Sequence, residues 1–251
     1  VKSGVYVYIN GQEVGYSEDS KNPAEFLINK YVKPGKNVLT LKIFRWSTGS
    51  YLECQDFWRI SGIERDVYLY SQPKVAIKDF RVTSTLDDTY KNGIFKLTMD
   101  IRNTGSQTSK DYIIGYKVFD PKTNKVIAES EKNSAFNANS TISLFGHTEI
   151  EIPDVKTWTS EHPNLYKLLM YIKDGEKIVE MVPFNIGFRR IEIKPIEQKA
   201  ANGQPYVCLF INGQPLKLKG VNIHEHNPAT GHYVPEDLMR RDFELMKRHN
   251  L

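Results

Sequence analysis

The sequence predicts a mainly β protein, with two antiparallel β-sandwich segments followed by the first strand and first helix of a truncated α/β barrel. Three observations support this fold class. Short runs rich in β-branched and aromatic residues alternate with turn signals along most of the chain. The composition includes 14 Tyr and 12 Phe, which favour strands. One clear helical pattern occurs, and it comes only after Pro235.

The first segment, residues 1–73, contains a hairpin over residues 4–16 whose arms join at Asn10-Gly11, a strong signal for a two-residue turn. Residues 38–46 alternate as a half-buried strand does, and residues 66–70 form a further strand candidate. We expect part of an antiparallel sandwich that lacks its opening strands.

The second segment, residues 74–187, contains seven short strand candidates separated by turn signals. This number of strands in roughly 110 residues is typical of an immunoglobulin-like β-sandwich. The Cys…Trp…Cys signature of true immunoglobulins is missing, so only the architecture is predicted. The strand candidates are residues 75–84, 94–103, 111–120, 125–130, 140–152, 166–173 and 177–187.

The third segment, residues 188–251, contains strand candidates at 190–194 and 206–218, with a second Asn-Gly turn at Asn212-Gly213. A helix is predicted from Pro235, which suits the first helical position. Residues 216–251 therefore have the order strand, loop, helix that opens an α/β barrel. A closed barrel needs roughly 200 residues or more, so most of its chemistry is expected to lie outside this chain.

Composition argues against several functional classes. The net charge of +4 is small for 251 residues, and the basic residues form no stripe of the kind that binds nucleic acid. No apolar run approaches the roughly 18 to 20 residues of a membrane span. Cys54 and Cys208 have no C-x-x-C partner, which favours two free thiols over metal or redox roles. Any leader would precede Val1, so the compartment, cytoplasmic or periplasmic, stays open.

The strongest local cluster is N-I-H-E-H-N, residues 222–227. In an extended backbone His224 and His226 project to one face, with Glu225 opposite. Three interpretations are open: a zinc site, histidines hydrogen-bonded within a loop, and contact with substrate hydroxyls. Zinc is the weakest of the three, because the H-E-x-x-H pattern and a nearby third ligand are missing.

A second cluster, residues 45–66, is dense in Trp, Tyr, Arg and carboxylates. Such a composition suits a surface on which sugars stack, a protein interface, or a buried charge network that joins two domains. Composition alone does not decide between these alternatives.

Four stretches carry a resemblance to the large β-galactosidases of glycoside hydrolase family 2. The longest is R-W-S-T-G-S-Y-L-E-C-Q-D-F-W-R-I-S-G-I-E-R-D-V, residues 45–67. The others are V-G-Y-S-E-D-S-K-N-P-A-E-F (14–26), W-T-S-E-H-P-N-L-Y (158–166) with G-F-R (187–189), and G-V-N-I-H-E-H-N-P (220–228). They occur in the family's order and spacing, so the resemblance covers essentially the whole chain.

This resemblance implies a jelly-roll sugar-binding domain over residues 1–73, an immunoglobulin-like sandwich over 74–187 and the start of a TIM-barrel catalytic domain over 188–251. It implies that His224, Asn222 and Thr48 bind substrate. At position 48 the family has an aspartate that contacts substrate and a sodium ion. Threonine cannot supply that anionic ligand, so the resemblance gives no support for sodium here.

The same resemblance places the acid/base glutamate, the nucleophilic glutamate and the magnesium ligands on later barrel strands. No catalytic or metal residue is therefore expected in this chain, and Glu225 is not a substitute. The longer protein is predicted to be a retaining exo-β-galactosidase that acts on terminal β-D-galactosyl residues, with magnesium in the full-length protein. We expect the 251-residue chain to show no glycosidase turnover.

Other classes remain open alongside this prediction. The chain could serve as a non-catalytic carbohydrate-binding fragment, or as an oligomerisation fragment, because an incomplete sandwich leaves strand edges that invite pairing. Within family 2, β-glucuronidase and β-mannosidase are the enzyme alternatives. The expected partners are a β-galactoside and further copies of the same chain, with neither nucleic acid nor membrane.

Overall fold

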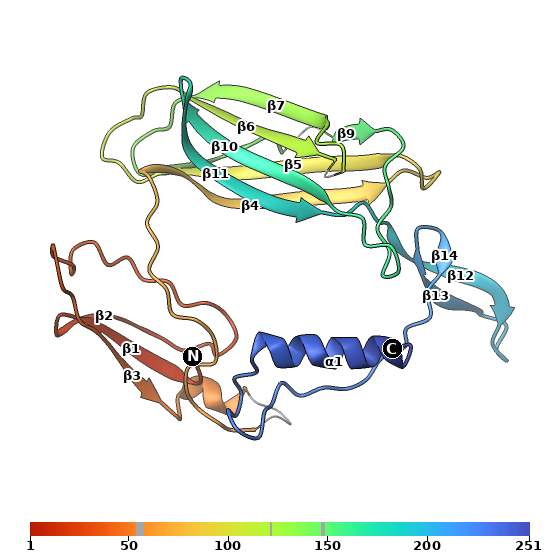
Figure 1. Cartoon of the computed structure of the whole chain (residues 1–251), viewed down its shortest axis with the longest axis horizontal. Coiled ribbons are helices and arrows are strands. Elements are labelled where there is room, and N and C mark those ends of the chain that lie inside the picture. Colours follow the sequence, from red (N-terminus) through yellow and green to blue (C-terminus); the bar gives the residue numbers. More distant parts are fainter. Residues whose placement is uncertain (54–57, 121, 147–148) are drawn as a thin grey trace. The chain divides into compact units, whose positions relative to one another are not determined.

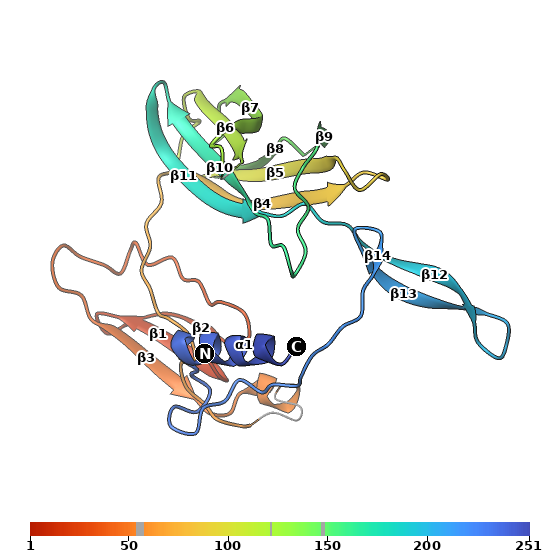
Figure 2. The same ribbon diagram turned by 45° about the vertical axis from the view of Figure 1, so that its right-hand side comes forward.

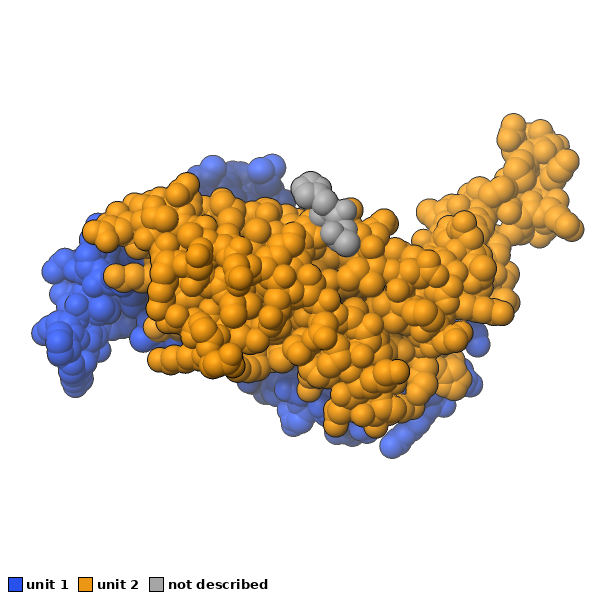
Figure 3. Space-filling model, turned by 90° about the horizontal axis from the view of Figure 1, so that it is seen from above, with its two compact units in different colours: residues 1–69, 219–251 blue, residues 70–218 orange. Residues whose placement is uncertain are grey.

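The computed structural model describes residues 1–53, 58–120, 122–146 and 149–251. The chain divides into two compact units, which Figure 3 shows in different colours. The first unit contains Val1–Leu69 and Lys219–Leu251, and the second contains Tyr70–Leu218. The three-domain division expected from the sequence remains a prediction, because these units group the segments by contact and not by chain order.

The first unit contains a small antiparallel sheet in the order β2-β1-β3 (Figure 1). Its strands are β1 (Gly4–Ile9), β2 (Gln12–Ser17) and β3 (Leu39–Phe44). Asn10 and Gly11 have φ angles of 52° and 80°, as a type I′ hairpin turn requires. The predicted hairpin and the strand predicted at residues 38–46 are therefore confirmed.

A short 3₁₀ turn, η1 (Thr48–Tyr51), follows β3, and the helix α1 (Glu236–Arg248) completes the first unit. The helix has acidic residues in its first turn and basic residues in its last turn, which matches the direction of the helix dipole. Pro235 is the N-cap, one position before the predicted one. Its apolar stripe is incompletely covered, since Phe243 is exposed.

Two predicted strands are not formed. Residues 66–70 have no strand assignment, and neither do residues 216–223, where the opening barrel strand was expected to precede the histidines. A strand is defined by its ladder of hydrogen bonds to a neighbour, and neither segment is paired with a strand in the part of the chain that the structure describes. Both predictions were therefore wrong for this chain, although their apolar patterns are strand-like.

The second unit is dominated by two facing antiparallel sheets (Figure 2). One sheet has the order β11-β10-β6-β7, and the other has the order β4-β5-β8 with β9 also on β5. All seven predicted strand positions are occupied, which confirms the sandwich. The strands are β4 (Val75–Leu86), β5 (Gly93–Asn103), β6 (Tyr112–Phe119), β7 (Val126–Ser134), β8 (Ser140–Leu144), β9 (Glu149–Ile152), β10 (Tyr166–Asp174) and β11 (Lys177–Ile186).

Alternation along these strands builds one continuous core between the sheets. Every second residue from Phe95 to Ile101 in β5 is buried, and every second residue from Leu168 to Ile172 in β10 lies in the same core cluster. This is the two-residue period that places one side of each strand toward the facing sheet. The core therefore follows directly from the apolar pattern of the sequence.

The strand predicted at residues 140–152 is divided into β8 and β9. β8 pairs with the second half of β5 and β9 with its first half, so the two short strands share one edge. Between them Phe145 has a φ of 67° and its buried ring packs edge-on against Tyr116, with centroids 5.3 Å apart. Residues 147 and 148 of the predicted strand lie outside the described residues.

A separate hairpin, formed by β12 (Ile191–Lys199), β13 (Pro205–Ile211) and the short β14 (Gln214–Pro215), follows the sandwich in the second unit. Asn212 and Gly213 have φ angles of 48° and 77°, so the predicted Asn-Gly turn is confirmed.

The side chain of Asn212 fixes this turn to two other segments. Its Oδ1 accepts a hydrogen bond from the Arg190 amide at 3.0 Å, and its Nδ2 donates to the Trp158 carbonyl at 3.1 Å. The turn is thereby joined to the sequence stretch that begins at Trp158.

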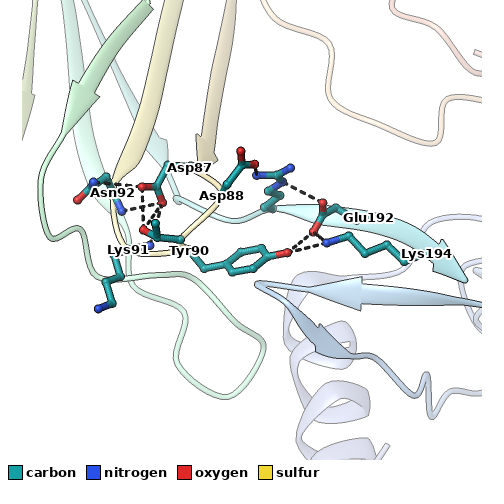
Figure 4. Close-up of polar contacts among 9 residues, drawn as sticks. Asp87, Asp88, Tyr90, Lys91, Asn92, Glu192 and Lys194 are labelled. Carbon is teal, nitrogen blue, oxygen red and sulfur yellow. Dashed lines mark hydrogen bonds and ion pairs between the residues drawn. The ribbon is translucent and has the colours of Figure 1, made fainter. Parts of the chain in front are cut away.

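Tyr90, in the β4–β5 turn, attaches this hairpin to the sandwich (Figure 4). Its hydroxyl donates to Glu192 at 2.8 Å and accepts from Lys194 at 2.7 Å. Its ring lies so close to Gly213 that a Cβ there would meet it at 2.7 Å. Asp87 fixes the turn that presents Tyr90, because its carboxylate accepts hydrogen bonds from the amides of residues 91 and 92.

No helix in the described ranges is long and apolar enough to cross a membrane.

Candidate functional site

The two sequence clusters singled out for chemistry come together in the first unit. We call residues 45–66, of which the structure describes 45–53 and 58–66, the aromatic loop, and we call residues 219–234 the histidine loop. The ring of His226 lies flat on the indole of Trp58, with centroids 4.6 Å apart and an interplanar angle of 6°. Arg65 forms an ion pair with Glu225 at 2.6 Å. The sequence did not predict this pairing of the two loops.

His232 is the third member of this contact, and sequence reasoning missed it. Its imidazole is 5% exposed, and its Nε2 lies 3.2 Å from the carbonyl oxygen of Trp58. Because a carbonyl oxygen accepts, this nitrogen must carry the proton. The ring also packs edge-on against His226, with centroids 6.5 Å apart. We call Trp58, His226 and His232 the ring cluster.

A closed turn in the histidine loop brings His232 back to His226. The amide of Asn227 donates to the Gly231 carbonyl and the amide of Gly231 donates to the Asn227 carbonyl, both at 2.8 Å. Gly231 has a φ of 68°, a conformation that glycine adopts without strain. A glycine four residues after Asn227 was an available sequence signal for this reversal.

The predicted substrate residues of this loop, Asn222 and His224, are exposed and lie in an extended stretch without strand assignment. Their immediate neighbours Glu225 and His226 contact the aromatic loop, as described above. The structure therefore brings the stretch that carries His224 next to the aromatic loop, while the assignment of Asn222 and His224 to substrate binding remains a prediction.

Thr48, the third predicted substrate residue, is exposed and begins η1. Glu18, from the second motif stretch, holds this turn by accepting a hydrogen bond from the Gly49 amide at 2.8 Å. The structure thus joins two motif stretches, since Glu18 contacts Gly49, 31 residues later in the sequence.

The carboxylate of Glu18 is kept ionised by its surroundings. The Tyr16 hydroxyl donates to it at 2.7 Å, and this bond, followed by the Gly49 amide, lowers the pKa of Glu18 below its usual value. The same bond raises the pKa of Tyr16 to about 12. A negative charge therefore lies beside Thr48, although position 48 itself carries only a hydroxyl.

The aromatic loop is also braced internally. The guanidinium carbons of Arg45 and Arg59 lie 5.2 Å and 5.7 Å from the ring centroid of Trp46, which is cation–π geometry. Arg59 also donates to the carbonyl of Ser50 at 3.2 Å, which ties the start of the loop to its later part. Of the predicted free thiols, Cys208 is half-buried in β13, and Cys54 lies outside the described residues.

The metal interpretation of the His224 and His226 pair gains no further ligand. Within the described ranges no group of three or more His, Cys, Asp or Glu side chains could hold a metal ion. His226 packs on Trp58. The Nε2–H of His232 is directed to a carbonyl oxygen, and a nitrogen that carries a proton cannot also bind a cation.

Comparison with known proteins identifies the family. Three models of glycosyl hydrolases family 2 match in order: the sugar binding domain over residues 1–73, the family 2 domain over 75–189, and the TIM barrel domain over 207–251. The chain belongs to glycosyl hydrolase family 2. Its residues from 207 onward are the start of a TIM barrel domain, which confirms the barrel expectation even though its first strand is not formed.

Relatives of this family 2 chain are much longer. It is 41% identical to a β-galactosidase of Priestia megaterium and 38% identical to one of Streptococcus thermophilus, in each case over the whole chain. It spans 23% and 22% of the lengths of these two proteins. A solved β-glucuronidase of Bacteroides uniformis superposes with a TM-score of 0.84 over 98% of this chain and 29% of that one. At 20% identity, this likeness shows the fold.

Proposed function

We propose that the chain is part of a longer retaining exo-β-galactosidase and supplies a portion of its galactose site. The observation that carries the proposal is the docking of the histidine loop on the aromatic loop, through the ring cluster and the ion pair of Arg65 with Glu225. These are two of the four stretches that carry the resemblance to the β-galactosidases. Identities of 41% and 38% to proteins named β-galactosidase support the same conclusion.

In this proposal the chain binds substrate and performs no bond cleavage. The His224 imidazole donates to and accepts from sugar hydroxyls, the Asn222 amide does the same, and Thr48 offers a hydroxyl. All three side chains are exposed and therefore accessible to a ligand. No catalytic role is assigned to Glu225, since its carboxylate is paired with Arg65.

The reaction itself requires two carboxyl groups about 5 to 5.5 Å apart, one protonating the leaving oxygen and the other forming the glycosyl-enzyme intermediate. We assign both glutamates to later barrel strands of the longer protein. We assign the magnesium ligands of the longer protein to the same later strands; the described residues bring together no group of three or more His, Cys, Asp or Glu side chains that could hold a metal ion. Thr48 likewise gives no anionic ligand for sodium.

The purified 251-residue chain is expected to release no nitrophenol from nitrophenyl β-galactoside, while the longer protein that contains it does so with retention at the anomeric carbon. Product analysis by proton NMR immediately after mixing distinguishes retention from inversion. Turnover by the 251-residue chain would contradict the assignment of the catalytic glutamates to later strands.

Substrate class is tested in the same assay. The longer protein is given the β-galactoside, β-glucuronide and β-mannoside of nitrophenol at equal concentration, and kcat/KM is expected to be highest for the galactoside. A higher value for the glucuronide or the mannoside would move the chain to another family 2 activity. If the longer protein cleaves none of them, the non-catalytic interpretations gain support, and calorimetric titration with galactose and light scattering then separate sugar binding from self-association.

A further inference from the structure

The hairpin of β12, β13 and β14 has two faces of different chemical character. Side chains alternate between the two faces of a strand, and residues directly opposite each other on paired strands share a face. On one face, which we call the apolar face, three cross-strand pairs contain only aliphatic side chains and a proline. These pairs are Ile191 with Ile211, Ile193 with Leu209, and Pro195 with Val207.

The apolar face is largely exposed. Ile191, Ile193 and Val207 are 56%, 74% and 65% exposed. As far as the described residues extend, none of the six belongs to the sandwich core or to the side chains packed against it. A contiguous apolar surface of this kind is typical of an interaction site. Because aliphatic side chains offer no hydrogen bonds to sugar hydroxyls, the face suits a protein partner and not a carbohydrate.

The opposite face attaches the hairpin to the sandwich. It carries Glu192 and Lys194, and both form hydrogen bonds with the Tyr90 hydroxyl (Figure 4). Arg190 adds an ion pair from its Nε to the Glu192 carboxylate at 3.1 Å. The hydrogen bond from Asn212 to the Trp158 carbonyl, described above, is a further point of attachment. The sandwich therefore holds the hairpin from one side and leaves the apolar face available.

The order of the chain indicates what covers the apolar face. The match to the TIM barrel domain begins at residue 207, within β13. The opening barrel strand is expected over residues 216–223, directly after β14 ends at Pro215. A chain that passes from the hairpin into that strand enters it at its N-terminal end. The hairpin therefore adjoins the end of the barrel at which the parallel strands begin, opposite the end that carries the active site.

We propose that the apolar face closes the N-terminal end of the barrel in the longer protein by packing on apolar side chains of the later barrel strands. The hairpin would then join the barrel to the sandwich, with the hydrogen bonds of Tyr90 on one face and the barrel on the other. This inference rests only on the part of the proposed function that places the chain in a longer protein with a complete barrel. It is independent of the sugar that is cleaved.

Photo-cross-linking in the longer protein tests which segment covers the face. Ile193 is replaced by benzoylphenylalanine, and the cross-linked peptides are identified by mass spectrometry. The expected product has the mass of one chain and joins position 193 to the helix-to-strand loops or the first residues of later barrel strands.

Three other outcomes would overturn the proposal. A product with the mass of two chains would make the face an interface between copies. A cross-link to the strand-to-helix loops would place the hairpin at the active-site end. If the probe is consumed without any cross-link, the face is open to solvent.

A charged substitution tests the consequence for stability. In the longer protein, Ile193→Asp is expected to shorten the half-life of the fold at a fixed elevated temperature about tenfold, because an unpaired carboxylate would be buried in an apolar contact. KM is expected to stay within twofold of the wild type, since the active site lies at the other end of the barrel.

The matched control is Ile178→Asp on β11, an isoleucine that is 48% exposed on the sandwich. It is expected to leave the half-life nearly unchanged. Equal losses in the two variants, or a change of KM in Ile193→Asp without loss of half-life, would contradict the docking.

Cross-links and half-lives, followed by mass and by circular dichroism, need no substrate, so the two proposals can fail separately. If the expected cross-links form but the longer protein cleaves no galactoside, the proposed function fails and the docking stands. If the galactoside is cleaved and position 193 forms no cross-link to the barrel, the docking fails and the proposed function stands.

Discussion

Large apolar side chains are buried in the sandwich of the second unit, whereas many of them are exposed in the smaller first unit. In the sandwich, large apolar residues from facing strands are fully buried, and the core is complete within Tyr70–Leu218. In the first unit, buried apolar residues are few, and many large ones are exposed. These exposed residues include Leu27, Tyr51, Leu52, Val67, Tyr68, Leu69, Val221, Ile223, Phe243 and Leu245.

The difference shows which part of the chain contains its own packing partners. Both sheets of the sandwich come from one continuous segment, so the apolar face of each strand packs against the apolar face of a strand in the facing sheet. The first unit combines strands, the described parts of the aromatic loop and a helix whose apolar stripe is incompletely covered. Exposed apolar surface of this extent is typical of surface that is covered in a larger assembly, and we expect the longer family 2 proteins to cover it.

Two matched leucines test this comparison with the largest expected effect. Leu168 in β10 is 0% exposed, whereas Leu69 is 78% exposed. Leu168→Ala is expected to lower the free energy of unfolding by about 2 to 5 kcal/mol, because it leaves a cavity in a closed core. Leu69→Ala is expected to change it by less than about 0.5 kcal/mol. Urea unfolding followed by circular dichroism measures both, and equal losses would refute the contrast.

Two glycines give a second test of how tightly each unit is packed. A Cβ at Gly115 would lie 2.6 Å from the ring of Tyr171, whose hydroxyl is fixed by Glu131, whereas Gly220 has no atom within 4 Å of such a Cβ. Gly115→Ala is expected to destabilise by about 1 to 3 kcal/mol through overpacking. Gly220→Ala should leave the urea midpoint nearly unchanged. A neutral Gly115→Ala would show that the sandwich is more plastic than its geometry indicates.

The attachment of the β12–β13 hairpin to the sandwich is tested by Tyr90→Phe. The ring against Gly213 is retained, but the hydrogen bonds with Glu192 and Lys194 are lost, at a cost of about 1 kcal/mol. Faster hydrogen exchange of the β12 and β13 amides, with the sandwich core unchanged, is the expected result. The control is Tyr206→Phe on β13, since the Tyr206 hydroxyl is in none of the described hydrogen bonds. A similar acceleration in this control would remove the assigned role from the Tyr90 hydroxyl.

The smallest expected effect is in the response of each unit to acid. In the second unit the Ser143 hydroxyl, and after it Arg81, hold the pKa of Asp100 below its usual value of 3.8. In the first unit the Tyr16 hydroxyl and the Gly49 amide hold the pKa of Glu18 below 4.5. A carboxyl whose pKa is lower in the folded state stabilises the fold above the unfolded value, and this contribution is lost as pH falls through the folded pKa.

We therefore expect each unit to lose stability below about pH 4 through its own carboxylate. Asp100→Asn and Ser143→Ala should flatten the acid response of the sandwich amide signals alone, and Glu18→Gln that of the first unit alone. Amide NMR spectra recorded across pH 2 to 6 separate the two responses. If Asp100→Asn also flattened the response of the first unit, the units would not behave as independent bodies.

Local signals in the sequence predicted much of the fold. The hairpin turns at Asn10-Gly11 and Asn212-Gly213 were found because each requires two residues with positive φ, and the sandwich strands were found from their two-residue period. Residues 66–70 have the same kind of pattern but are not a strand, because pairing depends on a neighbour that a local pattern does not reveal. The division of residues 140–152 into β8 and β9 likewise depends on pairing, because the two short strands pair with different halves of β5.

The candidate site was predicted in part. His224 and the aromatic loop were identified from composition and from the family resemblance, whereas His232 was not. Its place depends on the turn closed by Asn227 and Gly231, and its partner is a backbone carbonyl, which no side-chain motif encodes. The stack of Trp58 and His226 joins residues 168 positions apart, and no spacing rule could have indicated it.

The turn at Asn212 has a consequence for the chemical ageing of the protein. Asparagine followed by glycine is the sequence most prone to spontaneous deamidation, which replaces the amide by a carboxylate. The resulting aspartate would still accept the hydrogen bond from the Arg190 amide, but an anionic oxygen would face the Trp158 carbonyl where the Nδ2 group now donates. Deamidation at this one position would therefore turn an attraction into a repulsion and loosen the hairpin of β12, β13 and β14.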